Sequence, residues 1–156
     1  MALSARSITI DLARYFKCPY YGDGVVLAKV IITFGTFDVF HVGHLRVLER
    51  AAVLGTKLVV GVSTDALNVH KKGRNPVYCQ NQRMEIICAL RCVSEAFFEE
   101  SLELKRHYLT EYKADILVMG NDWKGRFDEF SDICDVIYLP RTPAISTTQV
   151  IEKVRS

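Results

Sequence analysis

The sequence predicts an α/β fold in which helices cover both faces of a doubly wound parallel sheet. Short, uninterrupted apolar runs recur along the chain, at residues 30–34, 57–63, 115–119 and 135–139. Segments with apolar residues at helical spacing lie between these runs. Strands buried on both faces are apolar throughout and need long crossover connections, so this alternation is typical of a parallel sheet. The loops after such strands are expected to carry the ligand site.

Length and composition indicate one soluble globular domain, because 156 residues with 49% hydrophobic and 24% charged residues can bury a real core. A formal net charge of only +2 argues against a nucleic-acid binder. No apolar run approaches the roughly 20 residues of a membrane span. The N-terminus also lacks the charged-then-apolar order of a signal peptide.

The cysteines predict a reduced, cytoplasmic protein, since they form neither an even framework nor a C-x-x-C pair. They are Cys18, Cys79, Cys88, Cys92 and Cys134. Cys88 and Cys92 stand four apart on a predicted helix. Buried thiols that act as small apolar groups are favoured there over the start of a metal site.

Residues 1–24 are expected to be an N-terminal extension, and residues 25–156 the core domain. Residues 8–16 have the pattern of a short helix, and residues 18–24 are rich in turn formers. The sequence leaves open whether this extension is a docking segment, a partner-binding arm or poorly ordered.

The core elements follow in order. A strand at residues 30–34 leads to a helix at 45–54, which stops at Gly55. A strand at 57–63 is followed by a polar loop that carries Lys71, Lys72 and Arg74. The next elements are a helix at 81–92, a strand at 96–98, a helix at 102–112 and strands at 115–119 and 135–139. Ser146 and Gln149 form a capping box for a final helix.

Residues 35–44, Gly-Thr-Phe-Asp-Val-Phe-His-Val-Gly-His, are the most informative stretch. A glycine-marked turn between a strand and a helix presents backbone N–H groups and the positive helix end to an anion. His41 and His44 begin the helix three residues apart, so their imidazoles share a face. Gly43 lacks a side chain and lets a ligand approach the backbone. Only Asp38 stands nearby as a third metal ligand, so the stretch predicts a polyphosphate site.

Three further loops carry residues suited to a nucleotide. Residues 68–74 are basic. They either form a solvated turn or make up a movable loop that brings its cations to a phosphate. Residues 120–127 offer hydrogen bonds to a base edge through Asn121 and Asp122 and a flat ring in Trp123, although taken alone this ring is better interpreted as a packing residue. Residues 141–148 combine an arginine with hydroxyls and a capped helix start, and each of these is a standard phosphate partner.

The order and spacing of these motifs resemble the cytidylyltransferase-like nucleotidyltransferases, in particular the bacterial glycerol-3-phosphate cytidylyltransferases, from about residue 30 to 154. The residues that carry the resemblance are 35–38, 41–44, 48–51, 63–65, Arg83, Arg91, 118–120, 122–123, 138–142 and 145–148. The resemblance implies a Rossmann-like fold with an H-x-G-H motif that holds the nucleotide phosphates. It also implies an enzyme, usually a homodimer, that uses CTP with Mg²⁺ and releases pyrophosphate.

We therefore expect residues 25–156 to transfer CMP from CTP to a small phosphomonoester. The acceptor phosphate, with a second pKa of about 6, is already largely dianionic and needs no general base. The expected catalytic residues are His41, His44, Lys71 and Arg141. The expected nucleotide-binding residues are Gly35, Thr36, Phe37, Gly43, Gly120, Asn121, Asp122, Trp123, Thr142, Ile145, Ser146 and Thr147. Residues expected to bind the acceptor or to orient other groups are Asp38, Asp65, Arg83 and Arg91. No protein ligand is expected for Mg²⁺, which the nucleotide phosphates mainly hold.

Departures from the family pattern put the acceptor in doubt. Pro143-Ala144 replaces a variable residue and a glycine, and Val42 stands where close relatives often have tryptophan. The basic loop is one residue longer, so the partner of Lys71 is either Lys72 or Arg74. Glycerol-3-phosphate is favoured by resemblance, with phosphoethanolamine, phosphocholine, a sugar phosphate, or ATP as the donor, as alternatives. A nucleotide-binding module without turnover is the alternative from another class. A truncated aminoacyl-tRNA synthetase is disfavoured, because the chain has no K-M-S-K-S-like loop.

Overall fold

The computed structural model of the protein describes residues 28–143 and 145–156. The expected extension at residues 1–24, with its short helix, and the substituted position Ala144 lie outside the described residues.

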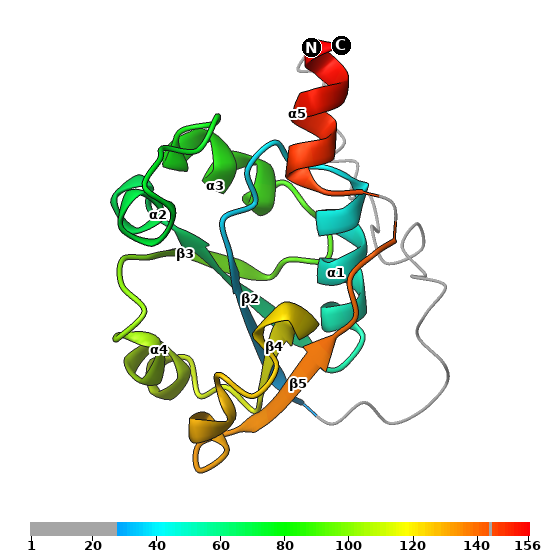
Figure 1. Cartoon of the computed structure of the whole chain (residues 1–156). Coiled ribbons are helices and arrows are strands. Elements are labelled where there is room, and N and C mark those ends of the chain that lie inside the picture. Colours follow the sequence, from blue (N-terminus) through cyan, green and yellow to red (C-terminus); the bar gives the residue numbers. More distant parts are fainter. Residues whose placement is uncertain (1–27, 144) are drawn as a thin grey trace, which may run out of the picture.

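The centre of the structure is a five-stranded parallel sheet with the order β3-β2-β1-β4-β5, shown in Figure 1. Its strands are β1 (Val30–Gly35), β2 (Lys57–Ser63), β3 (Glu95–Glu99), β4 (Ile116–Gly120) and β5 (Asp135–Leu139). From β1 the chain forms β2 and then β3 at one edge, and it then returns to form β4 on the other side of β1 and β5 at the opposite edge. The predicted doubly wound α/β fold is therefore confirmed, and its switch point lies between β1 and β4, where such folds bind ligands.

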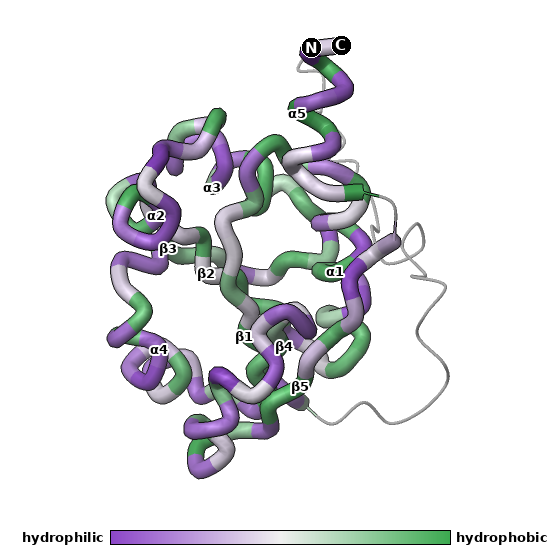
Figure 2. Tube along the Cα trace, in the orientation of Figure 1, coloured by the Kyte–Doolittle hydropathy of each residue, from purple (hydrophilic) through white to green (hydrophobic). Residues whose placement is uncertain are grey.

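Helices cover both faces of this sheet. On one face, α1 (Val42–Ala52) and α3 (Gln80–Cys88) pack against a core that includes Ile31, Val60 and Val118. On the other, α4 (Lys105–Glu111) and the short helices η2 (Asn121–Trp123) and η3 (Asp128–Phe130) flank a core that includes Ile32 and Leu117. Successive strand residues enter opposite cores, because side chains alternate across a strand. Figure 2 shows apolar residues along the strands and many polar residues on the surrounding helices.

The expectation of a polar loop after β2 is wrong, since α2 (Asp65–Lys72) occupies most of that segment. The Thr64 hydroxyl accepts from the Leu67 N–H at the start of this helix, and Gly73, with φ of 68°, ends it. Basic residues in the last turn stabilise this helix, because they interact favourably with the negative end of the helix dipole. Two good caps, rather than an apolar stripe, specify this helix, which is why apolar periodicity did not reveal it.

Element ends also differ from the expectation. Helix α1 starts at Val42, and α4 starts at Lys105. Helix α3 ends at Cys88, so Cys88 and Cys92 do not share a helix face. The Cys88 thiol is exposed rather than buried, whereas Cys134 is buried as expected of a small apolar group.

The final helix, α5 (Thr147–Arg155), begins at the predicted cap. The Ser146 hydroxyl accepts from the Gln149 N–H at 3.2 Å. This helix stands apart from the sheet in Figure 1 and buries none of its residues. Across the described residues, every helix is too short or too polar to cross a membrane.

Candidate active site

A cavity of about 910 Å³ opens at the carboxyl edge of the sheet, where the ends of β1, β2, β3 and β4 contribute to its wall. Most of the predicted site residues line it. They are Gly35, Thr36, Phe37, Asp38, His41, Gly43, His44, Lys71, Gly120, Asp122, Trp123, Arg141, Thr142, Ile145, Ser146 and Thr147. The predicted residues Asp65, Arg83, Arg91 and Asn121 are not among the lining residues.

The two histidines of the motif lie against each other at the start of α1. Their rings stack with centroids 3.9 Å apart. His41 is the N-cap residue, and its Nδ1 accepts from the Gly43 N–H at 3.0 Å. Because an accepting ring nitrogen carries no proton, the neutral His41 ring holds its proton on Nε2.

Burial keeps both rings neutral. It lowers the pKa of His41, and it lowers the pKa of His44 to about 4, with His41 and Lys72 adding to the effect and Asp38 opposing it. The His44 Nδ1 is buried and has no hydrogen-bond partner among the described residues. At neutral pH the pair therefore offers N–H donors rather than charges to an anion.

Gly43 has a packing role that the sequence did not indicate. A Cβ placed there would lie 2.7 Å from His41 Cε1 and 2.9 Å from Ile145 Cγ2. The space above this glycine is thus already filled by the His41 ring and by the loop that precedes α5. The missing side chain lets these two segments close over the start of α1.

The loop between β1 and α1 is held in an unusual backbone conformation. Phe37 and Val39 have φ of 53° and 44°, in the left-handed region that a β-branched residue such as Val rarely adopts. Between them, the Asp38 carboxylate accepts from three backbone N–H groups, those of Val39, Val77 and Tyr78, at 2.8 to 3.0 Å. Such conformations persist where surrounding contacts over-determine them, and they cluster at functional sites.

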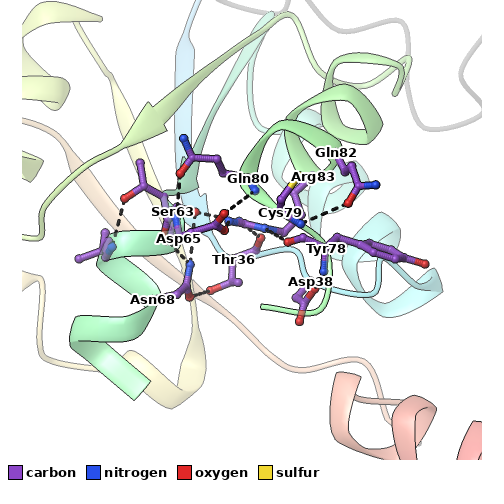
Figure 3. Close-up of polar contacts among 12 residues, drawn as sticks. Thr36, Asp38, Ser63, Asp65, Asn68, Tyr78, Cys79, Gln80, Gln82 and Arg83 are labelled. Atoms are coloured by element: carbon purple, nitrogen blue, oxygen red, sulfur yellow. Dashed lines mark hydrogen bonds and ion pairs between the residues drawn. The ribbon is translucent and has the colours of Figure 1, made fainter. Parts of the chain in front are cut away.

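Arg83 links the loop after β1, the end of β2 and the segment before α3, and Figure 3 shows its polar contacts. Its side chain is fully buried. The guanidinium donates to the carbonyls of Thr36 at 2.7 Å, Ser63 at 2.8 Å and Tyr78 at 3.0 Å, and it pairs with the Asp65 carboxylate at 2.7 Å. Arg83 thereby fixes the ends of β1 and β2 relative to α3.

These contacts favour the orienting role for Arg83 and Asp65 over acceptor binding. The other Asp65 oxygen accepts from the Gln80 N–H, and Gln80 Oε1 accepts from the Asp65 N–H. Helices α2 and α3 are thus tied together at their starts. Arg91 lies in the turn before β3, at the amino edge of the sheet, away from the cavity lining.

The neighbouring lysines of α2 point to different parts of the cavity. Lys71 Nζ donates to Ser63 Oγ at 3.1 Å, deep at the end of β2. Lys72 Nζ donates to Thr36 Oγ1 at 3.4 Å, beside the motif loop. The Thr36 hydroxyl itself donates to the fully buried Asn68 at 2.7 Å. Because successive side chains on a helix point in different directions, Lys71 and Lys72 place their ammonium groups in two different parts of the cavity.

A buried ionic cluster, which the sequence analysis missed, forms the floor of the cavity beside Lys71. Glu99, at the end of β3, and Lys105, at the start of α4, are 1% and 2% exposed and form an ion pair. Ser63 Oγ donates to Glu99 Oε2 at 2.6 Å. Burial lowers the pKa of Lys105, and Glu99 opposes that lowering. The one available signal was the position of Glu99 at a strand end.

The loop after β4 closes the far wall. Arg141 Nη2 lies 3.1 Å from Asp122 Oδ2, so this cation and this carboxylate are paired across two loops. Arg126 lies over the Trp123 ring at 5.1 Å. A Cβ at Gly120 would lie 2.4 Å from Asp122 Oδ1, so the absence of a side chain lets the Asp122 carboxylate fold back over the end of β4. The wall thus offers a ring face, an acid and two arginines.

The start of α5 meets the motif loop. The Thr147 hydroxyl donates to the Asp38 carbonyl at 3.2 Å. The two helix starts predicted to hold phosphates, α1 and α5, therefore border the same cavity.

The described residues contain no cluster of three His, Cys, Asp or Glu side chains fit to hold a metal ion. The carboxylate nearest the histidines, Asp38, already accepts from backbone N–H groups through both of its oxygens.

Comparison with known proteins shows the family of this chain. Residues 32–153 match the family described as cytidylyltransferase-like. The glycerol-3-phosphate cytidylyltransferase of Bacillus subtilis (strain 168) is 43% identical over 126 residues, which cover 81% of this chain and 97% of that protein. The enzyme of the same name from Staphylococcus aureus (strain NCTC 8325 / PS 47) is 39% identical over 81% of this chain and 95% of that protein.

Among solved structures, a lipopolysaccharide core biosynthesis protein from Thermoplasma volcanium GSS1 superposes with a TM-score of 0.65 and 26% identity. The match covers 73% of this chain and 98% of the other.

Proposed function

The chain belongs to the cytidylyltransferase-like family, and we propose that it transfers CMP from CTP to glycerol-3-phosphate, giving CDP-glycerol and pyrophosphate. The observation that carries this proposal is that hydrogen-bond donors and cations line one cavity in two separate places. One place has neutral imidazole donors at a helix start, and the other has two lysines on a buried floor. A reaction that joins a nucleotide to a second phosphate compound needs both. Similarity to the Bacillus and Staphylococcus enzymes over nearly their full lengths supports the choice of substrates.

In this proposal, an oxygen of the acceptor phosphate attacks the α-phosphorus of CTP in line. The new bond joins that oxygen to the α-phosphorus, and the bond from the α-phosphorus to the bridging oxygen breaks. Pyrophosphate leaves with that electron pair. No proton need be removed, since the acceptor is already dianionic at neutral pH. Catalysis is then positioning and charge stabilisation.

The nucleotide end uses residues near the motif loop. His41 Nε2–H and the neutral His44 ring donate to phosphate oxygens as charge builds on them. Lys72, beside Thr36, and Arg141 balance the charge of the leaving pyrophosphate. The helix start at Ser146 and Thr147 offers backbone N–H groups to the same phosphates. Lys72 here takes the role first expected of Lys71, because Lys71 points to the cavity floor.

The acceptor end lies at the floor. Lys71 and Lys105 offer two ammonium groups from separate helices, which suits a phosphomonoester dianion. Trp123 and Phe127 line another side of the cavity, and no aromatic cage for a quaternary ammonium is needed by this acceptor. A sugar phosphate, phosphoethanolamine or phosphocholine would use the same two cations.

The proposal includes Mg²⁺, which reaches the site on the nucleotide phosphates, since the described side chains offer it no ligand cluster. When bound, Mg²⁺ would supply additional neutralisation of phosphate charge. The proposal also includes a cytoplasmic homodimer, and light scattering of the purified chain measures that oligomeric state.

Pyrophosphate release tests the function directly. The purified protein is incubated with CTP and one phosphomonoester at a time, and then with ATP in place of CTP. We expect release with CTP and glycerol-3-phosphate, and CDP-glycerol as the product by mass spectrometry. CTP binding without release from any acceptor would instead establish a nucleotide-binding module. Faster release with another acceptor would reassign the substrate.

A further inference from the structure

The buried carboxylate of Glu99 is the most unusual group in the cavity, because it lies between two lysines from different helices. We infer that Glu99 is the positioning residue of the acceptor end, which holds Lys71 and Lys105 at the floor so that together they bind the acceptor phosphate. This inference rests on the proposed function for its substrate. Its geometric basis is independent of which phosphomonoester is used.

Sheet register brings the parts of this cluster together. Ser63 of β2 pairs directly with Glu99 of β3, so both side chains stand at the end of their strands on one face. Ser63 Oγ donates to Glu99 Oε2 at 2.6 Å. Lys71 Nζ donates to the same Ser63 Oγ at 3.1 Å and lies 3.8 Å from Glu99 Oε2. Lys105 Nζ binds the other oxygen, Oε1. One carboxylate thus fixes a hydroxyl and two ammonium groups.

The need for this carboxylate follows from burial. Lys105 is 2% exposed, and its ammonium lies 3.7 Å from the centre of the Phe34 ring. A buried ammonium without a counter-ion deprotonates rather than remaining charged. The charged groups that face Lys105 are Glu99, which favours its protonated form, and Lys71 and Arg126, which disfavour it. Glu99 is therefore the one group in this set that keeps the ammonium charged.

The charges of the cluster also suit an anion. Two lysines and one carboxylate leave one net positive charge at the floor of the cavity. Both Glu99 oxygens are already bound, to Ser63 and to Lys105, so the carboxylate is not available as a base. Glu99 acts through the lysines and does not itself contact the reacting atoms.

The test is Glu99→Gln, which keeps the shape and removes the charge. Loss of one charge-assisted interaction predicts an increase in the KM for glycerol-3-phosphate of about tenfold to a hundredfold. We expect the KM for CTP to change less than about twofold, since the variant leaves the nucleotide end intact. The matched control is Glu95→Gln, on the same strand, where the carboxylate forms an exposed pair with Lys57. That variant should leave both KM values unchanged.

The pH profile separates positioning from a structural role. In the wild type, Glu99 keeps Lys105 charged, so the KM for the acceptor should stay flat from neutral to mildly alkaline pH. In Glu99→Gln, Lys105 loses its proton at lower pH, so that KM should rise as pH increases. Equal increases in both KM values, or an unchanged pH profile with a lower Tm, would overturn the inference.

A double-mutant cycle keeps the inference testable if the single variant folds poorly. Lys105→Met with Glu99→Gln removes the buried pair together, which proteins often tolerate. Glu99→Gln is introduced into the wild type and into Lys105→Met, and the increase in acceptor KM is compared. If Glu99 acts through Lys105, the increase in the Lys105→Met background should be much smaller than the increase in the wild type. Fully multiplicative effects would contradict this inference.

Phosphate binding separates failure of this inference from failure of the proposed function. Calorimetry with inorganic phosphate measures the acceptor end without turnover. We expect wild type and Glu95→Gln to bind phosphate and Glu99→Gln to bind it at least about tenfold more weakly. If the wild type binds phosphate more tightly than Glu99→Gln but releases no pyrophosphate from CTP, the proposed function fails and the role of Glu99 stands. Equal phosphate affinity in wild type and Glu99→Gln refutes the role of Glu99, whatever the turnover.

Discussion

The two ends of the cavity to which the proposed function assigns the nucleotide and the acceptor are built in contrasting ways. At the nucleotide end, the motif loop and the start of α1 are continuous in sequence, and Gly43, His41 and His44 contact one another within a few residues. At the acceptor end, the groups come from β2, α2, β3 and α4, and they meet only because Ser63 and Glu99 are paired in the sheet. The first end uses neutral donors, and the second uses buried charges. A site made by local structure is thus joined to one made by tertiary structure.

The largest effect is expected from removing Arg83, whose side chain bonds to both ends of the cavity. Arg83→Met leaves the Thr36 carbonyl without this donor, removes one of two side-chain donors to the Ser63 carbonyl and leaves the Asp65 carboxylate without its cation. Losing several bonds from a buried cation, each worth about 1.5–3 kcal/mol, predicts a loss of about 3–5 kcal/mol in the free energy of unfolding. Urea denaturation measures this. The control, Arg106→Met, removes an exposed pair with Asp132 and should change the free energy of unfolding much less. Equal losses in both variants would show that Arg83 does not join both ends.

The next effect is confined to the nucleotide end. His44→Ala removes a preorganised donor, which predicts a loss of about 10²–10³ in turnover. Pyrophosphate release measures turnover, and circular dichroism checks that the fold is kept. His107→Ala, at an exposed histidine on α4, is the matched control and should retain full activity. Turnover of His44→Ala near that of the wild type would remove this histidine from the mechanism.

Substitutions of Lys71 and Lys72 test whether the two ends of the cavity have separate functions. We expect Lys71→Met to raise the KM for the acceptor and Lys72→Met to raise the KM for CTP, each by about tenfold. The reason is that Lys71 reaches Ser63, whereas Lys72 reaches Thr36. Steady-state kinetics with each substrate varied in turn measures both values, and each variant is the control for the other. If both variants raised the same KM, the division of the cavity would be wrong.

The smallest effect is a pH dependence from the nucleotide end. Burial lowers the pKa of His44 from 6.5 to about 4. Between those values the unfolded chain binds the additional proton, so this group's contribution to stability is complete above pH 6.5 and is lost as pH falls toward 4. The free energy of unfolding contributed by this group changes by at most about 1.4 kcal/mol per pH unit.

Urea denaturation at several pH values, for wild type and His44→Gln, isolates that contribution. The variant should lose less stability than the wild type between pH 6.5 and 4. His107→Gln should follow the wild type, and identical slopes in wild type and His44→Gln would argue against a buried, neutral His44.

Most of the fold followed from apolar patterns, as β2 and β4 illustrate, because a strand buried on both faces leaves an uninterrupted apolar run. Helix α2 did not follow, since caps at Thr64 and Gly73 specify it without an apolar stripe. Among the predicted site residues, Arg83 illustrates what pattern alone leaves open. Its place in a motif identified it, but its contacts with three carbonyls favour an orienting role over ligand binding.

The sequence by itself determined the doubly wound sheet and the strand, turn and helix start between Gly35 and His44, because strand, turn, cap and helix dipole are local properties of neighbouring residues. Only the tertiary structure decided where Lys71 and Lys72 point and that Glu99 and Lys105 lie at the floor of the cavity. Apart from the place of Glu99 at a strand end, a linear pattern does not reveal this buried pair, because an isolated glutamate or lysine is ordinarily exposed. Their burial depends on the pairing of β2 with β3 and on the packing of α4, which long-range contacts alone establish.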